Sequence, residues 1–285
     1  MEVRNISNQV KKYIYFLPFA FIIGLFLAIP FFNMVRRSFL CTNGQWGIEQ
    51  YREIFTKTIY VKAITNSVAI ALTSTTLGLV IDFLTTISLD KWLAPHKRCY
   101  LALLNLTSTY AGLPLTMSFI TILGTSGVFV LISRAIHFTP LENYNLYSLS
   151  GMFIIFLYFQ IPMGTLLIVP AIQKVKKEWK EAAKLMNCSS LYFWIRVGIP
   201  VMWPALMGTF SMLFTNALTA YTTPYLLTGN NIAFLPIKIA DMYVGDIKQR
   251  PELGSALSMV MLFIIVMVLA ITNCLKRCCS KGYES

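Results

Sequence analysis

The feature that most limits how this chain can fold is a series of long apolar runs separated by short polar segments. Each run has about 20 or more residues with few charges, which is the length that a helix needs to cross a bilayer. Lipid offers no hydrogen-bond partner to a bare backbone, so a spanning segment must be a helix or part of a closed barrel. Runs of this length favour helices, and the sequence therefore predicts an all-α integral membrane protein.

Composition agrees with a membrane class. Apolar residues make up 56% of the chain and charged residues 13%, and the mean hydropathy is +0.63. This excludes an ordinary soluble domain. A net charge of +12 would suggest nucleic acid as the partner of a soluble chain, but here the basic residues lie between apolar runs, so membrane topology explains them better. The six Cys and two His lack ligand-like spacing, so we expect neither a metal site nor a disulfide framework.

We expect six transmembrane helices. The first run follows a basic segment, 1–12, and is long enough to cross without a clear cleavage site, so it is treated as an uncleaved span. The third span is expected to be interrupted near Gly112 and Pro114, and the Gly-punctuated segment after it to return along the outer surface. The expected spans are 13–35, 63–89, 99–123, 149–172, 201–224 and 255–274. A short amphipathic helix is expected at about 48–55, before the second span, and a tail at 275–285.

Counting Lys and Arg predicts the orientation. With the amino terminus inside, the inner segments carry fifteen basic residues: Arg4, Lys11, Lys12, Lys91, Lys97, Arg98, Lys174, Lys176, Lys177, Lys180, Lys184, Arg196, Lys276, Arg277 and Lys281. The outer segments carry nine: Arg36, Arg37, Arg52, Lys57, Lys62, Arg134, Lys238, Lys248 and Arg250. Because loops that stay in the cytoplasm are enriched in basic residues, both termini and the loop 174–200 are expected to be cytoplasmic.

The segment 176–200 is a basic interruption between two apolar runs. If 178–186 is helical, its apolar residues Trp179, Ala182, Ala183 and Met186 share one face. Asn187 follows the last periodic position, where a left-handed residue commonly ends a helix. Ser189 and Ser190 can cap a second short helix that runs to Pro200. The segment is therefore expected to be a short docking helix, a tight turn and another helix.

The same segment carries a spaced motif. Its residues are Glu181, Ala182, Ala183, Asn187, Val197, Ile199 and Pro200. The motif resembles the EAA loop of permease subunits of binding-protein-dependent ABC importers, in which Glu-Ala-Ala is followed at these spacings by Gly and by Ile-x-Leu-Pro. Asn187 replaces the Gly, and Asn is the next most permissive residue for a left-handed turn. The resemblance extends in length and span order over essentially the whole chain.

The resemblance implies a type I importer permease fold with a permease domain at 13–274 and a cytoplasmic coupling helix. It implies contact with an ATPase subunit through Trp179, Glu181, Ala182, Ala183, Met186, Asn187, Val197, Ile199 and Pro200. The partners that it implies are a pair of ABC ATPase subunits, a second permease subunit, identical or homologous, an extracytoplasmic binding protein and membrane lipid, in a bacterial inner membrane. No nucleic acid is expected.

The chain is not expected to be an enzyme. It contains no Gly-x-x-x-x-Gly-Lys-Ser/Thr phosphate loop, the motif that cradles nucleotide phosphates. No cofactor is therefore expected on this chain, and the resemblance implies that ATP and Mg²⁺ bind the partner ATPase. A secondary transporter or channel is the alternative class. It would need its own coupling-ion site, for which one intramembrane acid and no repeated spans give little support.

Polar residues within the spans are candidates for the translocation pathway. Asp82 is an acid inside an apolar run, and it either contacts a cation in the pathway or lies near the inner membrane surface within reach of Lys91. The other candidates are Asn105, Thr107, Thr109, Tyr110, Asn216, Thr219, Tyr221 and Thr222. Such residues also serve as hydrogen bonds between helices, so both roles stay open.

The substrate is expected to be a polyamine. Within the importer family, the stretch 216–257 resembles permeases for spermidine and putrescine, and in relatives those for phosphonate, thiamine or ferric iron. Asp82 is compatible with a polycation. The binding protein generally sets specificity in this branch, so the permease carries little information about the solute.

Overall fold

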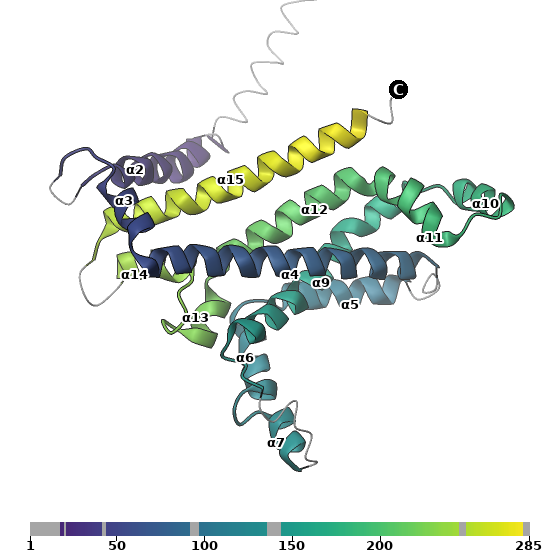
Figure 1. Cartoon of the computed structure of the whole chain (residues 1–285), viewed down its shortest axis with the longest axis horizontal. Coiled ribbons are helices and arrows are strands. Elements are labelled where there is room, and N and C mark those ends of the chain that lie inside the picture. The colour runs from purple at the N-terminus through teal and green to yellow at the C-terminus, as the bar shows by residue number, and fades with distance from the viewer. Residues whose placement is uncertain are drawn as a thin grey trace, which may run out of the picture. The chain divides into compact units, whose positions relative to one another are not determined.

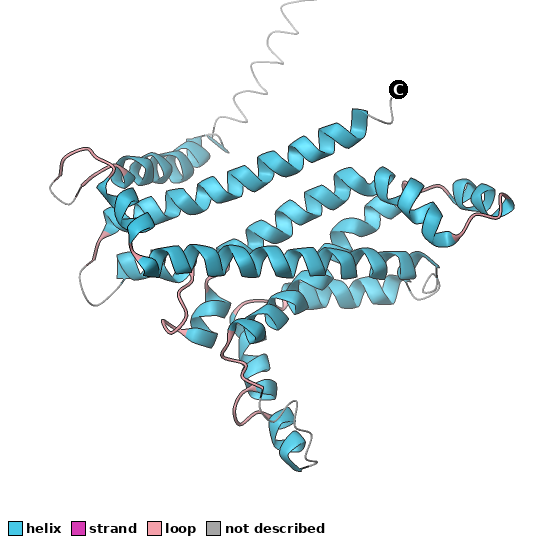
Figure 2. Cartoon of the chain, in the orientation of Figure 1, coloured by secondary structure: helices cyan, strands magenta, loops and turns pink. Residues whose placement is uncertain are grey.

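The computed structural model describes residues 18–19, 21–41, 44–91, 97–135, 144–244 and 249–281. Within those residues the chain is helical, with one isolated antiparallel bridge between Leu40 and Trp46 (Figures 1 and 2). The helices are η1 (Gly24–Ala28), α2 (Ile29–Ser38), α3 (Glu49–Thr56), α4 (Thr58–Lys91), α5 (Lys97–Thr109), α6 (Leu113–Leu123), α7 (Val128–Ala135), α9 (Leu149–Ile172), α10 (Lys177–Leu185), α11 (Ser190–Phe193), η3 (Trp194–Gly198), α12 (Ile199–Thr219), α13 (Thr222–Thr228), α14 (Leu235–Val244) and α15 (Pro251–Lys281).

Six helical stretches in the described part are long and apolar enough to cross a bilayer. They are Phe21–Ser38, Thr58–Leu89, Leu113–Arg134, Leu149–Ile172, Ser190–Thr219 and Pro251–Arg277. The predicted all-α class with six spanning helices is confirmed. The predicted segment 1–12, the end of the chain at 282–285 and the side chain of Lys91 lie outside the part that the structure describes.

The third stretch differs from the expected span 99–123. α5 ends at Thr109, and Gly112, with a φ of 69°, starts α6 in a backbone conformation that residues with a Cβ rarely adopt. The predicted interruption is therefore a complete break. After α6, the N–H of Gly127 donates to the carbonyl of Gly124 (2.8 Å), and this turn leads into α7. The third candidate span is thus 113–134 rather than 99–123, because α5 has only 13 residues and is too short to cross a bilayer.

The chain divides into two compact units. Unit 1 comprises 1–61 and 238–263, and unit 2 comprises 62–237 and 264–285. In unit 1, the predicted amphipathic helix near 48–55 is α3, which lies close to the start of α15. Arg250 binds the carboxylate of Glu53 with both guanidinium ends (2.7 and 2.6 Å), and Lys57 binds the same carboxylate (2.7 Å). This ion-pair cluster ties α3 to the segment that leads into α15.

Unit 2 is assembled around α9, which contacts α5, α12 and α13. α9 remains helical although it contains Pro162 and Pro170. Hydroxyl groups link other helices of the unit: Ser211 of α12 contacts Thr272 of α15 (2.7 Å), and Thr116 of α6 donates to Thr223 of α13 (3.1 Å). Such hydrogen bonds hold helices together where the surrounding lipid is as apolar as the side chains.

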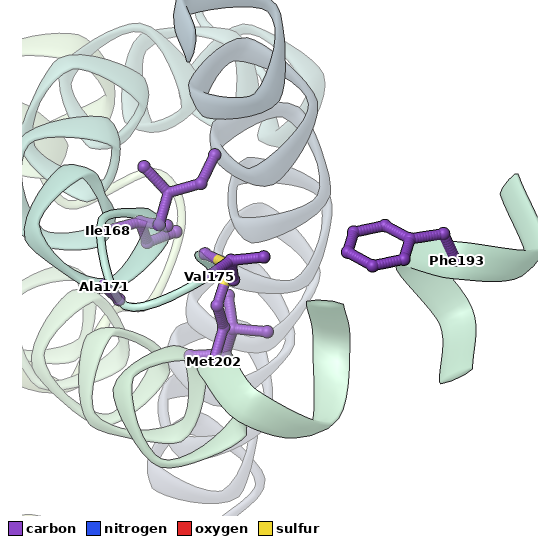
Figure 3. Packing of buried hydrophobic residues seen from close by; sticks show 7 residues of the cluster. Ile168, Ala171, Val175, Phe193 and Met202 are labelled. Atoms are coloured by element: carbon purple, nitrogen blue, oxygen red, sulfur yellow. The ribbon is translucent and has the colours of Figure 1, made fainter. Parts of the chain in front are cut away.

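One apolar cluster joins the membrane helices of unit 2 to the segment after α10. It consists of Ile168, Ala171, Ile172, Val175, Phe193, Met202 and Leu206. Figure 3 shows the ring of Phe193 reaching from its own helix toward the helices that carry the other side chains. The end of α9, the start of α12 and α11 therefore share one core.

Candidate functional site

The candidate site is built on α10, a nine-residue helix with no buried residue. Glu178 lies in its first turn and Lys184 in its last turn, which complements the helix dipole at both ends. Figure 1 shows α10 at the same end of unit 2 as the carboxyl end of α4. The expected docking helix 178–186 is therefore present within one residue, and its surface is available to a partner.

Asn187 ends α10 in the predicted left-handed conformation, with a φ of 54°. The N–H of Cys188 donates to the carbonyl of Ala183 (2.9 Å), and the N–H of Asn187 donates to the carbonyl of Lys184 (3.0 Å). These two bonds form a Schellman motif, which satisfies carbonyls that the helix end would otherwise leave open. The turn thus has a left-handed residue at the position where the motif of the resembled family has Gly, and Asn187 adopts that conformation here.

Ser189 caps the next helix as predicted, because its hydroxyl accepts a hydrogen bond from the N–H of Tyr192 (3.3 Å). The expectation that this second helix ends at Pro200 is wrong. α11 continues through the π-helical turn η3 into α12 without a break. Pro200 has no N–H to donate to the preceding turn and its ring crowds that turn, so the wider π-turn accommodates it.

The two faces of α10 differ from the expected division. Ala183 lies on the side that faces α4 and α11, where it shares a cavity with Lys180 and Lys184. Leu185 and Met186 do not line that cavity, and 89% and 82% of their surface is exposed, with Met186 at the border of a second cavity beside Tyr192. Ala182 is exposed as well, and Trp179 lies at the edge with its ring under the ammonium of Lys176. The free apolar face is therefore Ala182, Leu185 and Met186, and Ala183 belongs to the inner face.

The remaining motif residues have packing roles. Val197 and Ile199 lie against the apolar cluster of unit 2 in the start of the helix that continues into the fifth span. Pro200 lies in the first turn of α12, directly after the π-turn that contains Val197. Glu181 is exposed on α10. The motif thus combines a part on α10 and its turn, 181–187, which is exposed except for Ala183, with an anchoring part at 197–200.

Asp82 is fully buried in unit 2, where Thr165 of α9 donates to its Oδ1 (3.1 Å). Its Oδ2 has no hydrogen-bond partner among the described residues and lies against Gly164, where any Cβ would overlap the carboxylate. The carboxyl of Asp82 thus lies in the contact between α4 and α9. Lys91 is nine residues further along α4, or about 13 Å along the helix axis.

The other pathway candidates have separate partners. Tyr110 binds Ser118 of α6 (2.7 Å) and borders an open cavity of about 450 Å³ with Met117 and Thr121. Asn216 donates to the sulfur of Met163 (3.2 Å), and Tyr221 stacks on Tyr225 (5.2 Å between ring centroids). The remaining candidates are at least partly exposed: Asn105, Thr107, Thr109, Thr219 and Thr222. Tyr110 is therefore the candidate that borders a cavity.

Sequence reasoning missed the polar contact line between α4 and α9. Gln160 is fully buried in α9 and donates to Ser74 of α4 (3.1 Å), and its Oε1 faces Gly78. Together with Asp82 and Gly164 these residues bring the two helices close. The available signal was the spacing of Ser74, Gly78 and Asp82 at four-residue intervals, which places them on one face of α4.

Several known proteins resemble this chain. A probable sulfate transport system permease protein from Helicosporidium sp. is 24% identical over 72% of this chain and 73% of that protein. The thiamine transport system permease protein of Haemophilus influenzae is 28% identical over 64% of this chain and 34% of that protein. A solved bacterial ABC transporter that imports the acidic polysaccharide alginate has a chain with a TM-score of 0.78 at 14% identity, covering 96% of this chain and 97% of its own.

The likeness to the solved transporter concerns the fold. It extends over 96% of this chain, in which six helical stretches are candidate spans. The family model for the inner membrane component of binding-protein-dependent transport systems matches residues 92–277, which include α10, its Schellman turn and the continuous helix of the fifth span. This protein therefore belongs to the family of binding-protein-dependent transport system inner membrane components.

Proposed function

We propose that this chain is the permease subunit of an ATP-driven importer and that α10 docks on a separate ATPase subunit. The observation that carries the proposal is the outer face of α10. Leu185 and Met186 are large apolar side chains that are almost completely exposed at the end of a short helix, which the Schellman turn closes. Exposed apolar residues gathered on one small surface are typical of a protein-protein contact. ATP and Mg²⁺ would then bind the partner, which is consistent with the absence of a phosphate loop in this sequence.

The coupling follows from how α10 is joined to the spans. The Schellman turn fixes the angle between α10 and α11, and α11 runs into α12 without a flexible link. Phe193 and Met202 share a core with the end of α9. When the ATPase pair closes on ATP, the docked helices move with it and carry α9 and α12 as a rigid body, which opens the pathway to the other side. This role requires a second permease subunit facing the first and a binding protein that delivers the solute.

For the substrate we propose a small charged solute, with sulfate and thiamine as the first candidates. The relatives described above carry those two names. The polyamine prediction drew on Asp82, which is fully buried and accepts a hydrogen bond from Thr165, so this residue gives a polycation no specific support. Melting shifts of the cognate binding protein with sulfate, thiamine and spermidine would separate the three. A shift with spermidine alone would restore the polyamine prediction.

The docking role is tested by copurification of the ATPase subunit with the tagged permease from membranes. The variant Leu185→Asp/Met186→Asp is expected to lose most of the ATPase, because two charges replace the apolar contact. Glu181→Lys is expected to weaken copurification in the same direction. Val244→Asp is the matched control, since Val244 is 81% exposed on α14. Full retention of the ATPase by the double variant would contradict the docking assignment.

A further inference from the structure

A cavity of about 400 Å³ lies on the inner side of α10, opposite the docking face. It is bounded by α10, by Phe193 and Trp194 after the turn, and by Ile87 near the end of α4. This volume falls in the range of small-molecule sites in proteins. The docking role rests on Leu185 and Met186, and neither residue lines this cavity.

The charges around this cavity all have one sign. Lys177, Lys180 and Lys184 line it, and no acidic residue of the described part does so. Glu178 and Glu181 of the same helix are not among its lining residues. The ammonium of Lys180 lies over the ring of Trp194 (5.2 Å to the centroid), and no carboxylate in the described part forms an ion pair with Lys177 or Lys184. The cavity is therefore suited to a compact anion.

The wall of the cavity is apolar. Ile87, Phe193 and Trp194 form it, with Ala183 beside them. Ile87 lies two residues before the end of the candidate span Thr58–Leu89, and Trp194 lies in the first turns of the candidate span Ser190–Thr219. The cavity is thus at the level where a membrane ends and head groups begin, a level at which Trp side chains are enriched.

We propose that this cavity binds the head group of an anionic phospholipid. The phosphate contacts Lys177 and Lys184, and the glycerol and the first acyl carbons lie against Ile87, Phe193 and Trp194. A free phosphate would use only the lysines, whereas a zwitterionic lipid would bring a positive group to a basic site. Basic pockets at the cytoplasmic ends of membrane helices bind acidic lipids for this reason. A bound lipid would brace α10 against α4 and make the coupling helix sensitive to membrane composition.

The test measures thermal unfolding of the purified full chain in neutral detergent. The probes are short-chain phosphatidylglycerol, the matching phosphatidylcholine and inorganic phosphate. Phosphatidylglycerol is expected to raise the unfolding midpoint in a saturable way, because a ligand that binds the folded state stabilises it. Lys177→Gln/Lys184→Gln is expected to weaken its apparent affinity about 25-fold, or about 2 kcal/mol, from the usual contribution of each lysine near an anionic lipid.

The matched control is Lys174→Gln/Lys176→Gln. It removes the same charge from the loop before α10, and neither residue lines the cavity. It should keep the affinity of the unaltered chain to within about threefold, roughly the effect of a change in surface field alone. Equal shifts with inorganic phosphate or with phosphatidylcholine, an equal loss in the control, or no shift with phosphatidylglycerol would each overturn the proposal. The readout needs neither ATPase nor transport, so its failure would leave the importer function standing.

Discussion

Asn187 shows how one residue decides the orientation of the coupling helix. Its φ of 54° lies in the left-handed region, which costs an ordinary L-residue about 1–2 kcal/mol. Asn bears this cost more easily than other residues with a side chain, because its short polar group can hydrogen-bond locally. The motif could therefore exchange Gly for Asn and keep both hydrogen bonds of the turn.

A substitution series at position 187 tests this account. Asn187→Gly is expected to be neutral or slightly stabilising, since Gly adopts the conformation without a steric penalty. Asn187→Val should lower the free energy of unfolding by about 1–2 kcal/mol, because a β-branched residue is disfavoured there. Thermal unfolding and ATPase copurification would be measured together. If Val behaved like Gly, the turn would not depend on the left-handed residue.

Gly164 is the residue on which the contact between α4 and α9 depends. A Cβ at this position would overlap the Asp82 carboxylate, and it would also touch Leu213 of α12. The side chain of Asp82 therefore occupies the space that a larger residue at 164 would need. The two helices approach each other closely because one of them has no side chain at the crossing.

Gly164→Ala is accordingly expected to destabilise the protein by about 1–3 kcal/mol through overpacking. The control is Gly208→Ala in α12, whose nearest added contact is the flexible end of Lys276 at 3.5 Å, so that variant should be neutral or slightly stabilising. Combining Gly164→Ala with Asp82→Ala should recover most of the loss in thermal unfolding. Absence of recovery would place the clash elsewhere.

At the scale of elements, the sequence predicted α10 and its turn well because the signals are local. The periodicity of apolar residues predicts the helix, Asn187 predicts where it ends, and Ser189 predicts the cap of the helix that follows. The face of α10 that is free could not be predicted in this way, because Ala183 fits the apolar spacing on either side. Which side is covered depends on α4 and α11, and that is a tertiary contact. The π-turn before Pro200 has no periodic signal either, so the helix was expected to stop there.

The ion-pair cluster between α3 and Arg250 gives a pH dependence at the same scale. The hydrogen bonds from Arg250, aided by Lys57 and opposed by partial burial, hold the pKa of the Glu53 carboxyl at about 2 instead of 4.5. A carboxyl whose pKa is lowered on folding stabilises the protein above its unfolded value. That contribution is complete above pH 4.5 and is lost as the pH falls from 4.5 toward 2.

Arg250→Gln is therefore expected to cost about 1.5–3 kcal/mol at neutral pH, the usual value of hydrogen bonds to a charged group. Hydrogen exchange of the α3 amides would measure it, and the difference from the unaltered chain should shrink as the pH falls through this window. Lys57→Gln serves as the control, because its exposed ion pair should contribute less than about 1 kcal/mol. A cost for Arg250→Gln that did not change with pH would point to lost packing.

For the whole molecule, hydropathy predicted that six helices cross the membrane but not which helices are neighbours. All spans are apolar, so composition does not distinguish the central helix α9 from a peripheral one. The neighbours are specified instead by a few buried polar residues and glycines, such as Gln160 opposite Ser74 and Gly164 opposite Asp82. Their pairing across helices becomes visible only when both helices are in place. The observed third span, 113–134, differs from the expected 99–123 because hydropathy averages over the break at Gly112.

Orientation in the membrane is a property of the whole chain, and unit 2 gives it a structural basis. Lys177 and Ile87 line one cavity, so the basic ends of α4 and α10 lie at the same end of the unit. Trp203, near the start of α12, donates to the carbonyl of Leu275 (3.3 Å), which brings Lys276 and Arg277 to the start of the same helix. Several basic segments therefore gather at one end, which by charge should face the cytoplasm.

Labelling of the native cysteines tests this orientation. Chains that keep one Cys each, with the other five replaced by Ser, would be treated with a membrane-impermeant maleimide in intact cells and in inverted vesicles. Cys99 at the start of α5 and Cys188 after α10 are at least partly exposed and should react in inverted vesicles. Cys41, between α2 and α3, should react from outside, because a single span separates it from the amino-terminal segment. Labelling after detergent solubilisation controls for reactivity. Reaction of Cys188 in intact cells would place α10 outside, beyond the reach of any cytoplasmic ATPase, and would reject both the orientation and the docking role together.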